Sequence, residues 1–346
     1  MQSERRRRLT PAIADVRRAV RTVFSPAAGV EFVLVGLSGG ADSLALAAAT
    51  AFEAHRAGVR AGAVIVDHQL QAGSANVAAA AAEQARRLGL DPVLVLTVTV
   101  GHSSGPEAAA RDARYAAFEQ ALTETGASAV LLGHTLDDQA ETVLLGLARG
   151  SGPTSLRGMS LRSGPYLRPM LGIRRSQTRA FCLDSALDPW DDPQNSDPRY
   201  ARVRVRDTVL PVLERELGPG ISAALVRTAD ALREDSDALD DLARTVLRSA
   251  WSDTEQGAVI AVQVLAEQSP AVRQRVIRFG AQARFGALFE RNHTIAVARL
   301  ITDWHGQEAL DLPGVRVVRQ GGALIFTDPG HNPSKGLPRS HGTSRH

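Results

Sequence analysis

The chain has 346 residues, of which 44% are hydrophobic and 22% are charged. This length suggests two domains, and this composition is typical of a globular protein rather than a disordered or fibrous one. No stretch reaches the roughly 18 uncharged apolar residues that a membrane span needs. We therefore expect no membrane partner and a cytoplasmic location.

Cysteine and lysine are each present only once, as Cys182 and Lys335. A single thiol cannot form a disulfide within the chain, so we expect no disulfide partner, and it cannot supply a Cys-x-x-Cys zinc, iron-sulfur or redox site. Almost all positive charge is therefore arginine. This bias can reflect the coding composition of the source genome, so local clusters of arginine, which bind phosphate with two parallel hydrogen bonds, are more informative than the net charge of +3.

Apolar segments alternate with alanine-rich segments in the first 150 residues. We predict strands at 31–37, 61–67, 92–98 and 128–133, all buried on both faces, and helices at 42–57, 74–88, 106–125 and 136–149. This order predicts an α/β fold with an open parallel sheet and helices on both faces. Ligands of such sheets bind beyond the carboxyl ends of the strands, where we expect the loops after Leu37, Val66 and Gly133 to meet.

The remaining chain has a different pattern. Gly218, Pro219 and Gly220 mark a boundary or a sharp turn, and a long amphipathic helix is predicted from about 222 to 251. Further helix is expected to about 303, followed by a β-hairpin around Gly321 and Gly322. We predict a catalytic domain at 1–220, a mainly helical domain at 221–327 and a disordered tail at 328–346.

The most informative segment is SGGADS, residues 38–43, directly after the first predicted strand. Gly39 and Gly40 allow a tight turn, and the hydroxyls of Ser38 and Ser43 lie beside the amides of a helix N-terminus, where an anion such as phosphate binds well. The segment is neither a Walker loop nor a dinucleotide fingerprint. The alternative is that the glycines only make a turn while Asp42 and Ser43 cap the helix.

A second cluster follows the fourth predicted strand. His134, Asp137, Asp138 and Glu141 lie at positions i, i+3, i+4 and i+7, on one side of a predicted helix. Carboxylate oxygens at this edge of the sheet suit Mg²⁺ with a triphosphate, and His134 is available to a charged transition state. The alternative is that Thr135 or Asp137 caps the helix and the acids lie near its positive end.

Two sets of arginines are candidates for binding anions. Arg111 and Arg114 share one face of a predicted helix, where they either neutralise phosphates, orient an activated base or lie in solvent. Arg199, Arg202 and Arg206 lie on one face if their segment is helical. If the segment is a strand, Arg202, Arg204 and Arg206 share one face instead. The adjoining loop WDDPQNSDPRY makes this second set a candidate contact for RNA phosphate or for a transferred amino acid.

The loop at 38–43 resembles the pyrophosphate loop of the ATP-pyrophosphatase (PP-loop) superfamily. Four more segments resemble one branch, the tRNA(Ile)-lysidine synthetase family: VDHQL (66–70), EAAARDARYAAF (107–118), LLGHTLDDQAETVLLGLARGSG (131–152) and WDDPQNSDPRYARVRVRDTVLPVL (190–213). The resemblance covers the first two thirds of the chain, and the last third is similar in helical character and in LPGVRVVR. The family usually has asparagine where Val203 stands and often has arginine where Gln71 stands.

The resemblance implies a two-step reaction. ATP adenylates the C2 oxygen of the wobble cytidine in the isoleucine tRNA with anticodon CAU and releases pyrophosphate, and the ε-amine of L-lysine then displaces AMP. The product reads AUA instead of AUG. The implied ATP-binding residues are Ser38, Gly39, Gly40, Ala41, Asp42 and Ser43; the implied ligands of Mg²⁺ are Asp42 and Asp138; the implied catalytic residues are Asp42, His134, Asp138, Arg111 and Arg114; and Arg199, Arg202 and Arg206 are assigned to tRNA or substrate.

Other functions remain open from the sequence. A tRNA thiolase of the same superfamily usually needs cysteines that this chain lacks, and an ammonia-dependent ligase of the NAD or GMP synthetase type leaves the basic patches unexplained. A protein that only binds nucleic acid needs no ATP and does not lose function in Asp42→Ala. By analogy, we expect the second domain to help position the tRNA. The sequence carries no signal for an oligomeric state.

Overall fold

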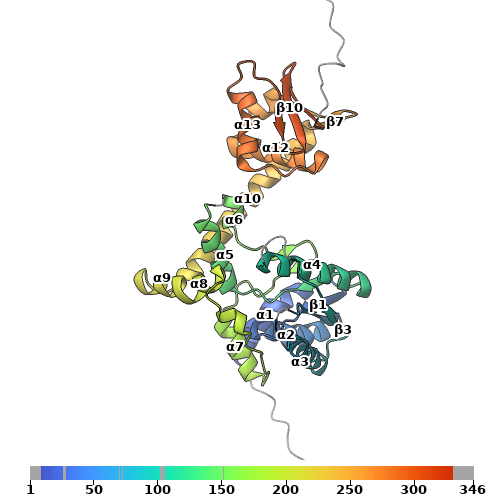
Figure 1. The fold of residues 1–346 in the computed structure, drawn as a ribbon, viewed down its shortest axis with the longest axis vertical. Helices are drawn as coiled ribbons and strands as arrows, with labels where there is room; N and C mark the ends of the chain where they lie inside the picture. The colour runs from blue at the N-terminus through green and yellow to red at the C-terminus, as the bar shows by residue number, and fades with distance from the viewer. Residues whose placement is uncertain are drawn as a thin grey trace, which may run out of the picture. The chain divides into compact units, whose positions relative to one another are not determined.

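A computed structural model of the chain describes residues 9–25, 29–69, 71, 73–101, 106–150 and 152–329. Contacts between residues divide it into a first unit that ends at Leu232 and a second unit that begins at Arg233 (Figure 1). The division falls inside a long helix, α10 (Ile221–Ala250). The tail predicted at 328–346 lies outside the described residues from 330 onward. None of the helices in the described part of the chain could cross a membrane.

The first unit contains a six-stranded sheet in the order β3-β2-β1-β4-β6-β5. Neighbouring strands are parallel except for β5 and β6, which are antiparallel. The strands are β1 (Phe32–Gly36), β2 (Arg60–Asp67), β3 (Val93–Thr97), β4 (Ala129–Leu131), β5 (Arg162–Ser163) and β6 (Tyr166–Leu167). The predicted α/β fold with a parallel sheet is therefore confirmed, and the four predicted strands correspond to β1–β4.

Helices cover both faces of this sheet (Figure 1). Alternating side chains of β1 separate the two layers: Val33 and Val35 pack with α1, α2, α3 and α7, whereas Phe32 and Leu34 pack with α4. The helical elements are α1 (Pro11–Arg21), η1 (Thr22–Phe24), α2 (Ala41–Ala57), α3 (Ser74–Arg87), α4 (Pro106–Thr125), α5 (Leu136–Ala148), α6 (Pro153–Leu156), α7 (Arg175–Asp184), η3 (Pro193–Ser196), α8 (Ala201–Arg204), η4 (Val205–Val209) and α9 (Leu210–Glu216).

The strand β3 differs from its prediction. It was expected to be buried on both faces, but it lies at the edge of the sheet and Val95 is 43% exposed. An apolar run cannot distinguish a central strand from an edge strand, because the order of strands depends on pairing between distant segments.

The strand order determines where the two sequence motifs meet. The central strand β1 pairs with β2 on one side and with β4 on the other. The order in which strands are added to the sheet therefore reverses between β1 and β4, and open α/β sheets bind their ligands at such a point. Gly133 makes the approach possible, because a Cβ there would lie 3.1 Å from the backbone nitrogen of Ser43. The loops that follow β1 and β4 are thus in backbone contact.

The second unit is mainly helical, as predicted, but it also contains a five-stranded sheet. Its sheet has the order β7-β8-β11-β10-β9, with antiparallel pairs, and α12 and α13 contribute to its core. The elements are β7 (Ser252–Thr254), β8 (Gly257–Ala261), α11 (Val262–Ala266), α12 (Pro270–Phe285), α13 (Arg291–Thr302), β9 (Leu310–Leu312), β10 (Val315–Gln320) and β11 (Ala323–Thr327). The predicted hairpin is β10 with β11. The prediction of helix from 252 to 261 is wrong because β8 is stabilised by pairing with β11, far along the chain.

Candidate active site

The phosphate loop (residues 38–43) forms a closed turn at the N-terminus of α2. The Ser43 hydroxyl donates to the carbonyl of Gly40 at 3.0 Å and accepts from the amide of Ser38 at 3.2 Å. Gly39 has a φ of +86°, which glycine adopts at little cost. The first amide that bonds within the helix is that of Leu44, so the amides of the preceding residues are available to an anion.

The loop is held from outside by two neighbouring segments. The amide of Trp190 donates to the carbonyl of Gly39 at 3.0 Å, and the thiol of Cys182 donates to the carbonyl of Ala41 at 3.4 Å. Burial raises the pKa of this thiol to about 12, so it is a neutral packing group at neutral pH. The backbone of the phosphate loop is therefore fixed by the chain that surrounds it.

The acidic helix α5 begins with a capping box. The Thr135 hydroxyl accepts from the amide of Asp138 at 3.4 Å, and the Asp138 carboxylate accepts from the Thr135 amide at 2.8 Å. Asp138 also faces away from the cap, because its second oxygen lies 2.8 Å from Nη2 of Arg175. Capping and a role in the site are therefore compatible for this residue. His134 precedes the cap rather than lying on the helix.

One guanidinium connects the phosphate loop to the acidic helix. Nε of Arg175 lies 3.5 Å from Oδ2 of Asp42, Nη2 lies 2.8 Å from Oδ1 of Asp138, and Nη1 lies 3.2 Å from Oε1 of Glu141. Asp42 also accepts a hydrogen bond from the hydroxyl of Thr178, one turn along α7 from Arg175. The first residues of α7 therefore bring the two predicted metal ligands, Asp42 and Asp138, to the same place.

Glu141 is the most enclosed acid of the site. Its side chain is 0% exposed, and Arg202 and Arg206 approach it in addition to Arg175. Nε of Arg206 lies 2.8 Å from Oε1, and Nε of Arg202 lies 3.2 Å from Oε2. A buried carboxylate needs such partners because an unpaired charge away from water is very costly. Two of the three arginines predicted to bind RNA or substrate therefore lie in the acidic site.

The third arginine of that set lies elsewhere. The segment that carries these arginines is helical rather than extended. It consists of the short helix α8 followed directly by the π-helix η4. Arg199 precedes α8, is 86% exposed and pairs with Asp197, with 2.6 Å between Nη2 and Oδ2. The carbonyl of Arg199 accepts from Arg204 at 2.8 Å, which fixes the backbone of this loop.

Arg111 and Arg114 lie on α4, and their contacts in the described part of the chain are with Tyr115 and His68 rather than with the phosphate loop. The guanidinium of Arg111 lies 4.9 Å from the ring centre of Tyr115 and donates to its hydroxyl at 3.4 Å. Nε of Arg114 lies 3.5 Å from Nε2 of His68, at the carboxyl end of β2. The structure thus brings Arg114 to the rim formed by β2.

Burial and charge shift the pKa values of the central groups in different directions. Burial raises the pKa of the Asp42 carboxyl, and the nearby Asp138 adds to this effect. Burial alone would raise the pKa of Asp138 too, but Arg175 and the hydrogen bonds from Thr135 more than offset it, so its pKa is lowered. Burial lowers the pKa of His134 to about 4, so this side chain is neutral at neutral pH rather than a cation.

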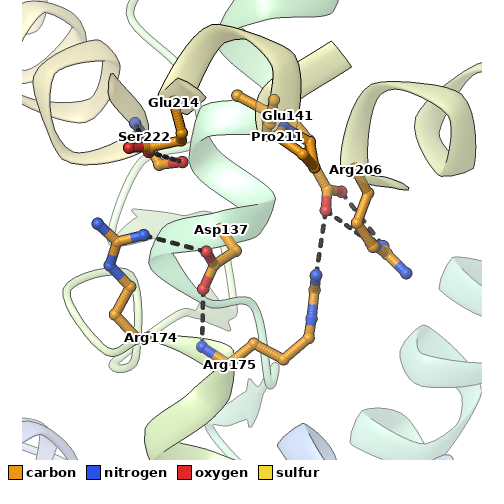
Figure 2. A pocket seen from close by; sticks show the side chains of 9 residues that line it. Asp137, Glu141, Arg174, Arg175, Arg206, Pro211, Glu214 and Ser222 are labelled. Atoms are coloured by element: carbon orange, nitrogen blue, oxygen red, sulfur yellow. Dashed lines mark hydrogen bonds and ion pairs between the residues drawn. The ribbon is translucent and has the colours of Figure 1, made fainter. Parts of the chain in front are cut away.

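A pocket of about 360 Å³ lies beside Arg175 (Figure 2). Arginines and acids face each other across it: Arg174 Nη1 lies 3.4 Å from Oδ1 of Asp137, whose other oxygen accepts from the amide of Arg175 at 2.7 Å. Figure 2 shows Arg206 turned toward Glu141. The lining residues are Asp137, Glu141, Arg174, Arg175, Arg206, Leu210, Pro211, Glu214 and Ser222. This volume is at the lower end of ordinary small-molecule sites.

The described residues contain no cluster of three or more histidine, cysteine or acidic side chains placed to hold a metal ion. The two predicted ligands Asp42 and Asp138 nevertheless suit Mg²⁺, because this ion is commonly bound by one or two carboxylates together with substrate phosphates. Both carboxylates already converge on one cation, the guanidinium of Arg175. The donor set therefore fits Mg²⁺ that binds together with a triphosphate.

Sequence reasoning missed Arg174, Arg175 and Thr178. A physical signal for the arginines exists, because two cations at the start of a helix oppose its dipole and so require acidic partners nearby. Asp137, Asp138 and Glu141 supply those partners. No sequence signal indicates that Thr178 contacts Asp42.

The structure shows the contacts of Gln71 and the burial of Val203, the two residues that depart from the family pattern. Gln71 donates to Oδ1 of Asp192 at 2.9 Å and so links the segment after β2 to the loop after Trp190. Val203 is only 7% exposed within α8, so it is a packing residue. Neither side chain contacts Arg175 or its carboxylates in the hydrogen bonds and ion pairs of the described residues.

Comparison with known proteins gives matches over both units. A family model described as PP-loop domain matches residues 13–213, and one described as TilS substrate binding domain matches residues 261–325. The chain is 63% identical to a tRNA(Ile)-lysidine synthase of Leifsonia xyli subsp. xyli over 302 residues, which cover 87% of this chain and 91% of the relative. It is 54% identical to one of Streptomyces coelicolor over 304 residues, which cover 85% and 84%.

Among solved structures, the chain is similar in fold to the U34-tRNA thiolase NcsA from Methanococcus maripaludis with its 4Fe-4S cluster. The TM-score is 0.54 at 20% sequence identity, and the match covers 64% of this chain and 80% of the other. At this identity the likeness concerns the fold alone.

The low pKa of His134 predicts a pH dependence of stability. The unfolded chain protonates this histidine near pH 6.5, whereas the folded chain does so near pH 4, so the unfolded state binds more protons between these values. The free energy of unfolding should therefore decrease as pH falls from about 6.5 to about 4, by up to about 1.4 kcal/mol per pH unit. His134→Gln should remove this slope in urea titrations, whereas replacing the exposed His305 should not. An unchanged slope in His134→Gln would contradict the assignment.

Proposed function

This chain belongs to the tRNA(Ile)-lysidine synthase family, and on that premise we propose that it joins L-lysine to the wobble cytidine of the CAU-anticodon isoleucine tRNA with ATP and Mg²⁺. It is an ATP-using ligase that modifies tRNA. The observation that carries the proposal is the convergence of Asp42, Asp138 and Glu141 on Arg175, beside a pocket of amino-acid size. Because tRNA and ATP occur in the cytoplasm, we propose that location.

In the first step, the phosphate loop binds the β- and γ-phosphates of ATP. Amides at the start of α2 and the hydroxyl of Ser38 supply donors for the phosphate oxygens, and the hydroxyl of Ser43 supplies a further one when it turns away from the carbonyl of Gly40. Asp42 and Asp138 would hold Mg²⁺, and the bound ion would neutralise the negative charge that builds up on the phosphates. The C2 oxygen of the cytidine then attacks the α-phosphorus, the bond to the bridging oxygen breaks, and pyrophosphate leaves.

Two arginines of α4 are proposed to support the same step. Arg111 and Arg114 lie on α4 at the rim, where they can bind phosphate oxygens or orient the adenylated base. His134 is neutral at neutral pH, so it can donate or accept a hydrogen bond but adds no charge. These assignments follow the family resemblance.

In the second step, lysine occupies the pocket next to Arg175. Its carboxylate matches the guanidinium of Arg174 or Arg206, and its two ammonium groups match acids such as Asp137 and Glu214. Leu210 and Pro211 offer apolar surface to its methylenes. Glu214 stays ionised, because hydrogen bonds from the Ser222 and Gly220 amides lower its pKa. The ε-amine, after losing a proton, attacks C2 of the base and AMP leaves.

The tRNA is proposed to contact both units. Arg199 presents an exposed guanidinium on a loop fixed by Arg204, and this geometry suits a backbone phosphate. Arg202 and Arg206 instead hold Glu141 inside the site. The second unit, which matches a substrate-binding family model, is proposed to position the tRNA body.

The alternative functions receive less support. A thiolase needs sulfur-carrying or cluster-binding cysteines, whereas the one cysteine, Cys182, is buried with a raised pKa. An ammonia-dependent ligase for a small molecule does not need a substrate-binding unit like that at 261–325. A protein that only binds nucleic acid does not need the phosphate loop and its paired carboxylates.

Removal of the Asp42 charge tests the nucleotide site. Asp42→Asn should reduce tRNA-dependent release of pyrophosphate from ATP by about 100-fold or more, because a proposed metal ligand is lost. The measurement is the rate of pyrophosphate release with ATP, Mg²⁺ and unmodified tRNA, without lysine. Glu124→Gln, which removes an exposed carboxylate near the end of α4, serves as the control and should retain the rate. A wild-type rate in Asp42→Asn would contradict the proposed ATP and metal site.

The lysine pocket predicts a selective effect on one substrate. Arg174→Gln should raise the KM for lysine by about tenfold or more, the value of one charge-assisted hydrogen bond, and leave the KM for ATP unchanged. Arg174 is suitable because it pairs with Asp137 at the rim rather than with the buried Glu141. Steady-state kinetics with each substrate varied in turn give both values. Equal changes in both KM values, or none, would place lysine elsewhere.

The RNA contact predicts a change in salt dependence. Arg199→Gln should weaken tRNA binding and reduce the slope of log affinity against log salt concentration by about one unit, because one phosphate contact is lost. Filter binding of unmodified tRNA at several salt concentrations measures both. The control, Arg162→Gln, removes an exposed arginine of the short strand β5. If Arg199→Gln binds tRNA with the wild-type slope, the RNA contact is not at Arg199.

A further inference from the structure

Every nitrogen of the Arg175 guanidinium faces a carboxylate. Nε faces Asp42, Nη2 faces Asp138, and both terminal nitrogens lie 3.2 Å from Oε1 of Glu141. The Arg175 side chain is 19% exposed, and those of the three acids are 26%, 13% and 0% exposed. One cation therefore binds three acids that come from two different helices, α2 and α5.

The three acids do not depend on Arg175 equally. Glu141 has two further arginine partners, Arg202 and Arg206. Asp42 and Asp138 have hydrogen bonds from the hydroxyls of Thr178 and Thr135, but their ion pairs in the described residues are with Arg175. Arg175 is therefore the cation that compensates the charge of these two carboxylates at close range.

The same two carboxylates are the proposed ligands of Mg²⁺. An ion that coordinates their oxygens at about 2 Å needs the lone pairs that now point at the guanidinium. Two cations at one place also repel each other strongly where water is scarce. Arg175 and the metal ion therefore compete for Asp42 and Asp138.

We propose that Arg175 is a positioning residue that stands in for Mg²⁺ before ATP binds, holding the carboxylates of Asp42 and Asp138 close together. This inference rests on the proposed metal role of these two acids. Mg²⁺ alone displaces a covalently attached cation poorly, so the ion enters together with ATP. A triphosphate offers the displaced guanidinium new partners, because arginine binds phosphate oxygens in the same forked geometry as carboxylates.

A purely structural role gives a different expectation. In that case Arg175 only attaches α7 to α2 and α5, and its loss weakens the fold in a way that no metal ion can restore. The proposed role, in which Arg175 occupies the place of Mg²⁺ (the placeholder role), predicts instead that loss of Arg175 leaves a site that binds Mg²⁺ without ATP. The response of stability to Mg²⁺ alone distinguishes the two roles.

The test measures the thermal unfolding midpoint of the whole chain without ATP and without tRNA. Arg175→Gln is compared with wild type at about 10 mM MgCl₂ and in NaCl of equal ionic strength. The variant should unfold at a lower temperature than wild type in NaCl, and Mg²⁺ should raise its midpoint by about 4 °C if the ion binds with millimolar affinity. Wild type should change by less than about 1 °C, because Arg175 already occupies the site.

Three further variants complete the experiment. Arg174→Gln removes the neighbouring arginine, which pairs with Asp137, and should respond to Mg²⁺ as wild type does. The double variant Arg175→Gln with Asp42→Asn should lose the Mg²⁺ response, because a ligand is gone. Should Arg175→Gln fail to fold, Arg175→Lys decides: one ammonium group cannot face three carboxylates at once, so a smaller Mg²⁺ response is expected.

The placeholder role is overturned if Mg²⁺ stabilises Arg175→Gln no more than Arg174→Gln, or if Arg175→Lys, used in its place, shows no response. It is also overturned if the double variant keeps the full response, because the ion then binds elsewhere. These outcomes are independent of the proposed reaction, since neither ATP nor tRNA is present. If Asp42→Asn lost pyrophosphate release but Arg175→Gln showed no Mg²⁺ response, the proposed function would stand and the placeholder role would fall.

Discussion

The first unit depends on how buried negative charge is compensated. Glu141 is fully enclosed on α5, and its carboxylate is paired with Arg175, Arg202 and Arg206, which approach it from α7, α8 and η4. Removing one partner of such a buried pair typically lowers the free energy of unfolding by about 3–5 kcal/mol, because neither water nor a counter-charge then solvates the remaining charge. The requirement therefore fixes the positions of two separate segments, α7 and the continuous segment α8–η4, around one helix. Arg175 and Arg206 also line the pocket, so the charge balance that stabilises this region contributes to the site as well.

The sheet supplies the second requirement, which is proximity. Pairing of β1 with β4 places the phosphate loop next to the start of α5, and Gly133 eases their close approach, because a Cβ there would lie only 3.1 Å from the backbone nitrogen of Ser43. Asp42 and Asp138 come from opposite sides of this contact and meet at Arg175. A nucleotide held by the loop would thus lie beside the acids without any further rearrangement of the strands. The chemistry proposed for ATP follows from this junction, and that proposed for lysine follows from the adjoining arginine-lined pocket.

The sequence allowed a good prediction wherever the signal is local. Strands β1–β4 and helices α2–α5 follow from alternating apolar runs, and the phosphate loop follows from glycines placed between a strand and a helix. Features made by distant segments were not predictable in this way. Arg175 and Thr178 act on residues of α2 and α5, β8 is stabilised by β11, and the edge position of β3 depends on the order of strands. Arg199, Arg202 and Arg206 were grouped by their spacing, but Arg199 lies before α8 on an exposed loop and pairs with Asp197.

The proposed reaction joins lysine to the wobble cytidine of one tRNA. The most direct measurement is incorporation of radiolabelled lysine into unmodified isoleucine tRNA with a CAU anticodon, in the presence of ATP and Mg²⁺. A tRNA with the wobble cytidine replaced serves as the control. Label is expected in the first tRNA and none in the second. Equal labelling of both, or tRNA-stimulated release of pyrophosphate without any incorporation of lysine, would contradict the proposed reaction.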